Sequence, residues 1–375
     1  MTSGKLFEAS NLGSLSLSNR VVMAPLTRAR ASIHHVPTDM MATYYAQRAD
    51  CGLIVSEATA VDPLGMGWFK APGIWTEEMV EGWKRVTDKV HDGGGRIVCQ
   101  LWHMGRLVLP DYLNGEVPIG PSAIAGEGET FAPRSAQDTG LLLPMKPYVV
   151  PREMEQEDID RAIESYAAGA RNALQAGFDG VEIHAANGYL IDQFLQSKTN
   201  VRQDRYGGSV ENRARFLSEV VDAVISNVEP GRVGMRVSPT SERKGMGDEN
   251  PAALAEEIGR IAQTAELAYV HLIEAIVSGF TEKPEHPVMA NLRRSYSGMV
   301  IQNGGFDAHS ANQFIADGQA DAISFGRPFI ANPDLVKRMK AGVALSAPNF
   351  DYAYVGDEKG YIDYPCYGDC HSETT

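Results

Sequence analysis

Eight short apolar segments of β-type composition recur along this chain, separated by helical patterns or glycine-marked turns. Each segment is almost continuously apolar, which is typical of strands in a parallel sheet that is buried on both faces. In chain order they are Arg20–Pro25, Gly52–Ser56, Arg96–Leu101, Val181–Ile183, Val233–Val237, Tyr269–Ile273, Val300–Gln302 and Ala322–Phe325. Eight alternating units of this kind predict an α/β fold, a single (β/α)8 TIM barrel.

A doubly wound sheet is the competing architecture for such an alternation. It is disfavoured because no Gly-x-Gly-x-x-Gly stands between a strand and a helix. Thr76 suits an N-cap, and acidic residues follow it early in the helix. The helices expected between the strands include Asp39–Arg48, Thr76–His91, a long helix within Pro151–Gly177, and Glu211–Asn227.

Two segments fall outside the repeat. A hairpin over Leu6–Leu17, with its turn at Asn11–Gly13, precedes the first strand and should plug the floor of the barrel. The long excursion Arg106–Pro151 follows the third strand and is rich in Gly and Pro, so we expect a lid or pocket wall on the C-terminal face. We assign residues 1–365 to the barrel and residues 366–375 to a C-terminal tail.

The charge balance excludes several classes of partner. The 375 residues include 34 basic and 48 acidic side chains, and the formal net charge is −14. Nucleic acid and anionic membranes are poor candidates, because binding them requires neutralising phosphate charge. Neither a secretory leader nor an apolar run of about 18 residues is visible. We expect a soluble, cytoplasmic monomer or homodimer.

The cysteines predict no metal site. Cys51 and Cys99 lie within or beside strand-like runs and are expected to be buried thiols. Cys366, Cys370 and His371 in the tail have no second ligand pair at zinc-finger spacing. A solvated, frayed terminus is the preferred interpretation of this segment.

The segment Gly180–Leu195 places polar side chains where a strand passes into a helix. His184, Asn187 and Tyr189 stand there around the flexible Gly188. In an α/β barrel this is the C-terminal face, where catalytic side chains collect. The imidazole and the amide can each donate a hydrogen bond to one oxygen, and the phenol keeps its proton at neutral pH. A satisfied structural histidine is the alternative, which three convergent polar groups make less attractive.

The loops after the seventh and eighth strands predict a phosphate site. Barrels often bind phosphate there, and the glycines let backbone N–H groups approach an anion. Arg327 adds a planar charged fork. A pair of tight turns is the structural alternative. The residues concerned are Asn303, Gly304, Gly305, Gly326 and Arg327.

Other strand ends offer groups that suit a planar cofactor. Gln100 can donate to and accept from the edge of a heterocycle, and Arg236 can stabilise negative charge that develops on a ring. Thr27 and Ala58 follow the first two strands. Together with a phosphate socket, these residues favour FMN over PLP, since no lysine occupies these strand ends to form a Schiff base.

Several motifs in register resemble the Old Yellow Enzyme family of FMN-dependent ene-reductases, of which the bacterial N-ethylmaleimide and pentaerythritol tetranitrate reductases are members. The resemblance extends from about Leu6 to Pro365. The motifs are Ala24-Pro25-Leu26-Thr27-Arg28, Gln100-Leu101-Trp102-His103-Met104-Gly105-Arg106, His184-Ala185-Ala186-Asn187-Gly188-Tyr189-Leu190 and Arg205-Tyr206-Gly207-Gly208-Ser209-Val210-Glu211-Asn212-Arg213.

The resemblance implies roles for individual residues. Thr27 tunes the flavin potential, Gln100 bonds the pyrimidine edge, and Arg236 stabilises the anionic reduced flavin. The residues implied to hold FMN are Ala24, Pro25, Leu26, Thr27, Ala58, Gln100, His184, Asn187, Arg236, Asn303, Gly304, Gly305, Gly326 and Arg327. Those implied to bind substrate are Trp68, Trp102, His184, Asn187, Tyr189 and Tyr354.

The implied reaction is ping-pong reduction of an α,β-unsaturated carbonyl or nitro compound by NAD(P)H. His184 and Asn187 bind the activating oxygen, hydride goes to Cβ, and Tyr189 protonates Cα. Two positions depart from common family members: Asn187 stands where many have histidine, and Trp68 where similar bacterial enzymes often have tyrosine. The alternatives are a flavin enzyme of the same fold that reduces nitrate esters, quinones or dienoyl thioesters, and a non-catalytic FMN sensor or store.

Overall fold

The computed structural model describes residues 4–133, 143–274 and 284–368. Its centre is a nine-stranded parallel sheet in the order β11-β12-β13-β14-β15-β3-β4-β6-β5, and the sheet closes because β6 also pairs with β11. The short β5 pairs with β6 outside this ring. The predicted TIM barrel is therefore confirmed. Its strands are β3 (Val21–Met23), β4 (Leu53–Val55), β5 (Thr59–Ala60), β6 (Ile97–Trp102), β11 (Gly180–Ala185), β12 (Val233–Val237), β13 (Tyr269–Ile273), β14 (Met299–Asn303) and β15 (Ala322–Phe325).

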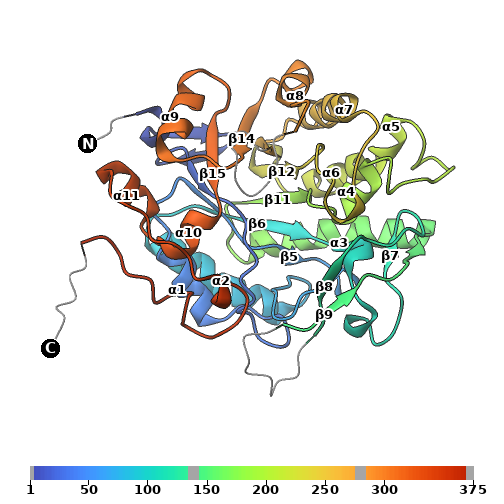
Figure 1. The fold of residues 1–375 in the computed structure, drawn as a ribbon, viewed down its shortest axis with the longest axis horizontal. Coiled ribbons are helices and arrows are strands. Elements are labelled where there is room, and N and C mark those ends of the chain that lie inside the picture. The colour runs from blue at the N-terminus through green and yellow to red at the C-terminus, as the bar shows by residue number, and fades with distance from the viewer. Residues whose placement is uncertain (1–3, 134–142, 275–283, 369–375) are drawn as a thin grey trace.

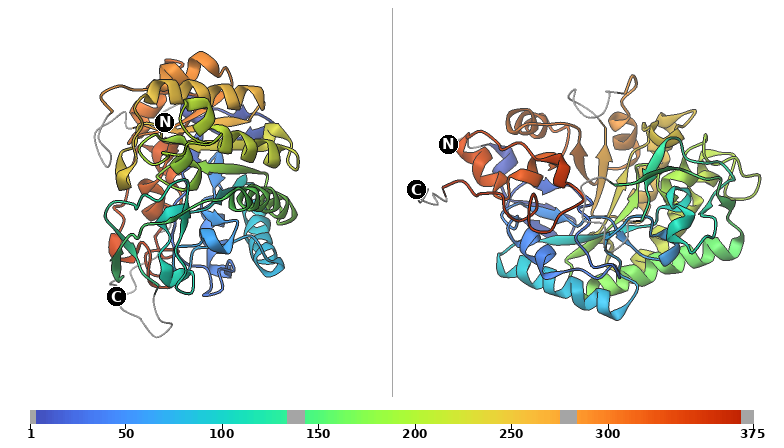
Figure 2. Two further views of the ribbon diagram at one scale, coloured as in Figure 1. Left: turned by 90° about the vertical axis from the view of Figure 1, so that its right-hand side faces the viewer. Right: turned by 60° about the horizontal axis from the view of Figure 1, so that its bottom comes forward.

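Helices surround the barrel (Figure 1). Both views of Figure 2 show α2 and α3 side by side on the outside, and the main hydrophobic core lies between such helices and the strands. The Thr76 side chain caps α2 as predicted, accepting from the backbone N–H of Met79. The helices are α1 (Asp39–Ala46), α2 (Glu77–Asp92), α3 (Gln156–Gln175), α4 (Leu190–Leu195), α5 (Val210–Arg213), α6 (Arg215–Ile225), α7 (Pro251–Thr264), α8 (Met289–Ser295), α9 (Ala308–Ala316), α10 (Arg327–Ala331) and α11 (Leu335–Ala341).

The prediction of one helix over Glu211–Asn227 is wrong, because the segment is divided into α5 and α6. Ala214 lies between them with φ −79° and ψ −8°. This ψ differs from the α-helical value of about −42°, and the α-helix is interrupted at this residue. The preceding Arg213 is tied to other segments: its Nε donates to the carbonyl oxygen of Leu195, and its Nη2 pairs with Asp248 at 2.7 Å. This end of the Arg205–Arg213 motif thus has a structural role.

The N-terminal hairpin closes the barrel floor, as predicted, but its turn is Gly13–Ser14 rather than Asn11–Gly13, because Asn11 and Leu12 pair with the second strand. Its strands, β1 (Ser10–Leu12) and β2 (Leu15–Leu17), are antiparallel, and their buried leucines pack among side chains from the barrel strands. Gly13 in the turn has φ +56°, and a Cβ there would lie 2.5 Å from the carbonyl oxygen of Gly231. Only glycine fits this close approach.

The excursion after β6 contains strands that the sequence analysis did not predict. Its β7 (Ile119–Gly120) pairs with β10 (Arg152–Glu153), and β8 (Glu129–Phe131) forms a hairpin with β9 (Met145–Pro147). These pairings join residues far apart in the segment, so local composition did not reveal them. Residues 134–142 of the predicted lid lie outside the described ranges.

Short 3-10 helices also occur along the chain, at Lys5–Phe7, Pro63–Gly65, Gly105–Leu107, Pro110–Tyr112, Pro230–Arg232, Arg243–Gly245 and Phe350–Tyr352.

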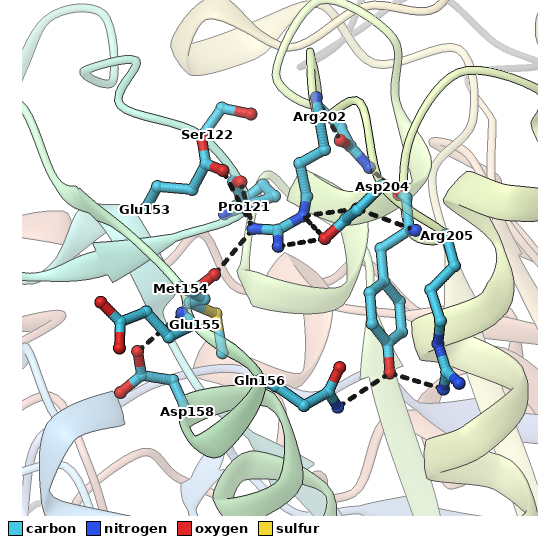
Figure 3. Close-up of polar contacts among 12 residues, drawn as sticks. Pro121, Ser122, Glu153, Met154, Glu155, Gln156, Asp158, Arg202, Asp204 and Arg205 are labelled. Carbon is cyan, nitrogen blue, oxygen red and sulfur yellow. Dashed lines mark hydrogen bonds and ion pairs between the residues drawn. The ribbon is translucent and has the colours of Figure 1, made fainter.

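Arg202 attaches this excursion to the barrel (Figure 3). Its Nη1 donates to the carbonyl oxygens of Pro121, at 2.9 Å, and Met154, at 2.8 Å, while its Nε donates to Asp204. One buried guanidinium therefore holds both limbs of the excursion against the loop that follows α4.

Cys51 and Cys99 are buried, as predicted. Burial raises the pKa of the Cys99 thiol to about 12, so it stays protonated at neutral pH. The described ranges contain no group of three potential metal-ligating side chains, whereas Cys370 and His371 lie outside those ranges. Within the same ranges, no helix has the length and apolar character needed to cross a membrane.

Candidate active site

The structure brings most of the predicted site residues to the C-terminal ends of the barrel strands. Register places His184 opposite Arg236 and Gln100 opposite Glu182. The loop after β3 carries Ala24, Pro25, Leu26 and Thr27, of which the last three are half-buried, and the buried Ala58 follows β4. Asn303 ends β14, and Gly326 and Arg327 follow β15 directly.

The turn between β11 and α4 has a constrained backbone. Asn187 and Gly188 are both left-handed, with φ of +61° and +82°, a conformation that asparagine tolerates better than most residues. The backbone N–H of Asn187 donates to Ser238 Oγ, and that of Gly188 to Asp192 Oδ2, each at 2.8 Å. Tyr189 then stands at the N-cap of α4. The turn therefore has one defined geometry.

Tyr189 lies in edge contact with two other site residues. Its ring centroid is 5.0 Å from that of His184 and 5.2 Å from that of Trp102. Burial, with the positive charges of Arg236 and Lys244, holds the pKa of His184 well below its usual range, so the imidazole is neutral. Burial raises the pKa of Tyr189, so the phenol keeps its proton. The pair can polarise an oxygen and deliver a proton.

Behind the turn lies Asp192, which the sequence did not identify. Burial raises the pKa of its carboxyl to about 7, against the opposing effect of hydrogen bonds from Gly188, Gln196 and Ser238. The Gln196 amide donates to Asp192 Oδ1 at 2.7 Å. Asp192 touches neither His184 nor Tyr189 in a hydrogen bond, so its role is to position the turn.

A polar layer crosses the barrel interior beneath this face. Gln100 Nε2 donates to Glu182 Oε1 at 2.8 Å, His271 Nδ1 lies 2.9 Å from Glu182 Oε2, and His271 Nε2 lies 2.8 Å from Ser324 Oγ. Both Glu182 and His271 are fully buried. Burial has the largest influence on the pKa of Glu182 and would raise it, but the interactions with His271 and with the positively charged Arg236 lower it below its usual value. Glu182 is thus a buried carboxylate that balances Arg236.

The buried nitrogens on this face that have no hydrogen-bond partner in the described ranges include His184 Nδ1 and Arg236 Nε. Buried polar atoms are normally satisfied, so both are available to a bound group. Burial lowers the pKa of Arg236 to about 10, which leaves it protonated at neutral pH. A ring that accepts hydrogen bonds and becomes negative on reduction suits this face.

Gly326, one of the glycines expected at the phosphate site, leaves room for a ligand. A Cβ on Gly326 would meet only Leu26 Cδ2 at 3.5 Å and Ala24 Cβ at 4.0 Å, both ordinary contacts. Packing within the protein therefore does not require glycine there, whereas close approach of an anion does. Gly304 is buried, and Gly305 is exposed with φ +81°. Arg327, which follows Gly326 in the sequence, is exposed.

Asn303 has contacts that its prediction as a cofactor ligand did not include. Its Nδ2 donates to the carbonyl oxygen of Ser324 at 3.0 Å, and its Oδ1 accepts from Arg236 Nη2 at 3.4 Å. Asn303 therefore links β14 to β15 and helps to orient Arg236.

Aromatic side chains form a second group on this face. The ring centroid of Trp68 is 5.2 Å from that of Tyr354 and 5.1 Å from that of Phe131. The sequence identified Trp68 and Tyr354. It missed Phe131, which β8 of the excursion supplies, and no local motif could have indicated it. This contact supports the prediction that the excursion forms a pocket wall.

Lys244 is a second residue that the sequence missed. It belongs to the loop after β12, and its Nζ lies 4.8 Å from the ring centroid of Tyr189. Lys244 lies seven residues beyond the end of β12, and no sequence pattern marks a residue there as part of the site. Only the conformation of the loop brings its side chain to Tyr189.

The chain is similar in sequence to known proteins over most of its length. Residues 5–346 match the family described as NADH:flavin oxidoreductase / NADH oxidase. A protein of Leishmania infantum named a probable flavin mononucleotide-dependent alkene reductase is 42% identical over 355 residues, which are 94% of this chain and 95% of that protein. The 12-oxophytodienoate reductase 1 of Oryza sativa subsp. japonica is 39% identical over 361 residues, 94% of this chain and 91% of that one.

Solved structures are also similar over nearly the whole chain. Morphinone reductase superposes with a TM-score of 0.92 at 44% identity, covering 100% of this chain and 99% of the other. The Old Yellow Enzyme homologue from Zymomonas mobilis superposes with a TM-score of 0.89 at 42% identity, covering 96% of this chain and 99% of the other.

Proposed function

The chain belongs to the NADH:flavin oxidoreductase / NADH oxidase family and is an FMN-dependent enzyme that reduces activated alkenes with NAD(P)H, and we propose that His184, Asn187 and Tyr189 carry the reaction. The observation on which the proposal rests is the constrained turn after β11. It holds a neutral imidazole, an amide and a protonated phenol within one short segment.

The proposed cofactor site uses groups from several strands. Gln100 and Arg236 face the ring, with the unpartnered Arg236 Nε available to it. Gly304, Gly305, Gly326 and Arg327 hold the phosphate, and the loop Ala24–Thr27 with Ala58 packs against the ring. When bound, FMN supplies a two-electron carrier that accepts hydride from NAD(P)H and gives it to the alkene.

The protein groups act on the alkene at two positions. His184 and Asn187 donate hydrogen bonds to its activating oxygen and stabilise the negative charge that develops there. Tyr189 donates its phenolic proton to the carbon next to the activating group. The phenol suits this role because burial keeps it protonated until the transfer. Trp68, Trp102 and Tyr354 shape the substrate side of the site.

The test uses the purified protein with FMN bound. Under anaerobic conditions, NADPH or NADH should bleach the yellow colour, and 2-cyclohexenone should restore it. A nitrate ester, a quinone and a dienoyl thioester are compared as alternative acceptors. Protein that does not bind added FMN, or that bleaches without reoxidation by any electron-poor alkene, would contradict the proposal.

A further inference from the structure

The charged side chains that act on His184, Tyr189 and Tyr354 are cationic, although the chain as a whole has a net charge of −14. The pKa of His184 is lowered by burial and by the positive charges of Arg236 and Lys244. The charged side chains that act on Tyr189 and Tyr354 are likewise arginines. A face of one charge sign concentrates ligands of the opposite sign.

The proposed cofactor accounts for part of this positive charge. Arg327 belongs to the phosphate site, and Glu182 balances Arg236 inside the barrel. Lys244 is not accounted for. Its Nζ lies over the Tyr189 ring at 4.8 Å, and no carboxylate in the described ranges forms an ion pair with it. On the same loop, by contrast, Glu242 pairs with Lys198 at 3.5 Å.

The backbone of Lys244 is held in an unfavourable conformation. Its φ of +60° and ψ of 29° are left-handed, which costs about 1 kcal/mol for a residue with a Cβ. The buried Arg106 holds this turn, because its Nη2 donates to the carbonyl oxygens of Lys244, at 2.9 Å, and Gly245, at 3.3 Å. The backbone N–H of Glu127 also donates to the Lys244 oxygen.

Arg106 joins this turn to the excursion after β6. Its Nη1 donates to the carbonyl oxygens of Ile124 and Ala125, each at 3.1 Å. The lysine is therefore presented by a braced turn rather than by a loose loop. Strain that the surrounding structure maintains at a functional site points to a role for the strained residue.

We propose that Lys244 forms a subsite for an anionic substituent, so that this enzyme favours activated alkenes that carry a carboxylate near the double bond over their neutral esters. The inference rests on the proposed function, since it places the carboxylate relative to the carbon that Tyr189 protonates. An ammonium group over the phenol ring is within reach of a substituent one or two bonds from that carbon.

The Lys244 ammonium group would donate a charge-assisted hydrogen bond to the substrate carboxylate, in a partly desolvated environment. Lys244 is half-buried, and burial beside Arg243 lowers its pKa to about 8. The ammonium form therefore predominates at neutral pH, and a bound carboxylate favours it further. Such bonds to charged groups correspond to about 10- to 100-fold in an equilibrium or rate ratio.

The experiment compares 4-oxopent-2-enoate with its methyl ester, which share the enone and differ in charge. For the FMN-loaded wild type, we expect kcat/KM to be higher for the acid. Lys244→Met keeps the Cβ and an unbranched chain, and should lower the ratio of kcat/KM for the acid to kcat/KM for the ester about 10- to 100-fold. Lys244→Arg should retain most of the preference.

Lys198→Met is the matched control, because this lysine lies close to the same loop but pairs with Glu242. It should leave the ratio of acid to ester unchanged. A second measurement does not depend on turnover: 4-oxopentanoate, which lacks the double bond, is titrated into oxidised enzyme and followed by the flavin absorbance. Lys244→Met should weaken this binding without weakening that of the methyl ester.

The outcomes separate the inference from the function on which it rests. If wild type reduces neither acid nor ester, the proposed function fails. If it reduces the ester but Lys244→Met leaves the acid-to-ester ratio unchanged, the subsite fails alone. A variant that only slows bleaching by NADPH or NADH, with the acid unaffected, would assign Lys244 to the nucleotide and overturn the inference.

Discussion

Gln100 Nε2 donates a 2.8 Å hydrogen bond to Glu182 Oε1 inside the barrel. A carboxylate can only accept, so the contact directs the amide nitrogen of Gln100 towards Glu182 and its carbonyl oxygen elsewhere. The other carboxylate oxygen contacts His271 Nδ1 at 2.9 Å. The orientation of a proposed cofactor ligand therefore depends on a residue below it that does not reach the cofactor face.

Replacing Glu182 should destabilise the barrel. Glu182→Leu leaves Gln100 and His271 without their acceptor and leaves Arg236 without its counter-charge. We expect the free energy of unfolding to fall by about 3–5 kcal/mol, as when one partner of a buried pair is removed. Glu182→Gln retains one acceptor and should cost less. Urea unfolding checks both variants, and a Leu variant as stable as wild type would refute the assignment.

Replacing Tyr189 by phenylalanine should separate the two halves of the catalytic cycle. The rate at which 2-cyclohexenone restores the yellow colour should fall by roughly 10²–10⁴-fold, because a positioned general acid is lost. The rate of bleaching by NADPH should stay near that of wild type. Stopped-flow absorbance measures both rates. Nitroalkenes, which are already strongly activated, should depend less on Tyr189, and an unchanged enone rate would exclude it as the donor.

Asp192 should make stability depend on pH. Its pKa rises from 3.8 to about 7 in the folded protein, so the folded state binds more protons than the unfolded state between these values. The contribution of this carboxyl to stability therefore falls as pH rises from about 4 to about 7, by at most about 4 kcal/mol.

Asp192→Asn removes this titration. The difference in unfolding free energy, wild type minus variant, should decrease across that window and stay constant above about pH 7. Urea unfolding at several pH values measures it. Glu57, whose pKa burial also raises to about 7, is present in both proteins and cancels in the difference. A difference independent of pH would show that Asp192 is ionised throughout.

Gly326→Ala should weaken FMN binding without weakening the fold. The φ of −96° lies outside the left-handed region that favours glycine, and the new Cβ would make only ordinary contacts. Stability without FMN should change by less than about 0.5 kcal/mol, while a methyl group facing the phosphate should raise the Kd for FMN about tenfold or more. Fluorescence titration measures the Kd.

Gly52→Ala provides the contrast. A Cβ at Gly52 would lie 1.9 Å from the carbonyl oxygen of Asn19, so this variant should lose stability whether or not FMN is bound. If Gly326→Ala binds FMN as tightly as wild type, the phosphate does not approach that residue.

Local sequence patterns predicted the barrel and the turn at the centre of the candidate site. The predicted bounds of β12, β13 and β15 agree with the structure, because a strand buried on both faces is apolar along most of its length. The turn with His184, Asn187 and Tyr189 was predicted for a similar reason. Its three side chains come from six consecutive residues, and the end of a strand determines the face on which they appear.

Only the closed fold decided the contacts between segments that lie far apart in the chain. Glu182 and His271 are 89 residues apart, and they meet because β11, β12 and β13 pair in one particular register. Phe131 reaches Trp68, and Lys244 reaches Tyr189, through the paths of long loops. The hydrophobic periodicity of the sequence indicates which face of a helix or strand is buried. Strand register and loop conformation determine which residues that face contacts.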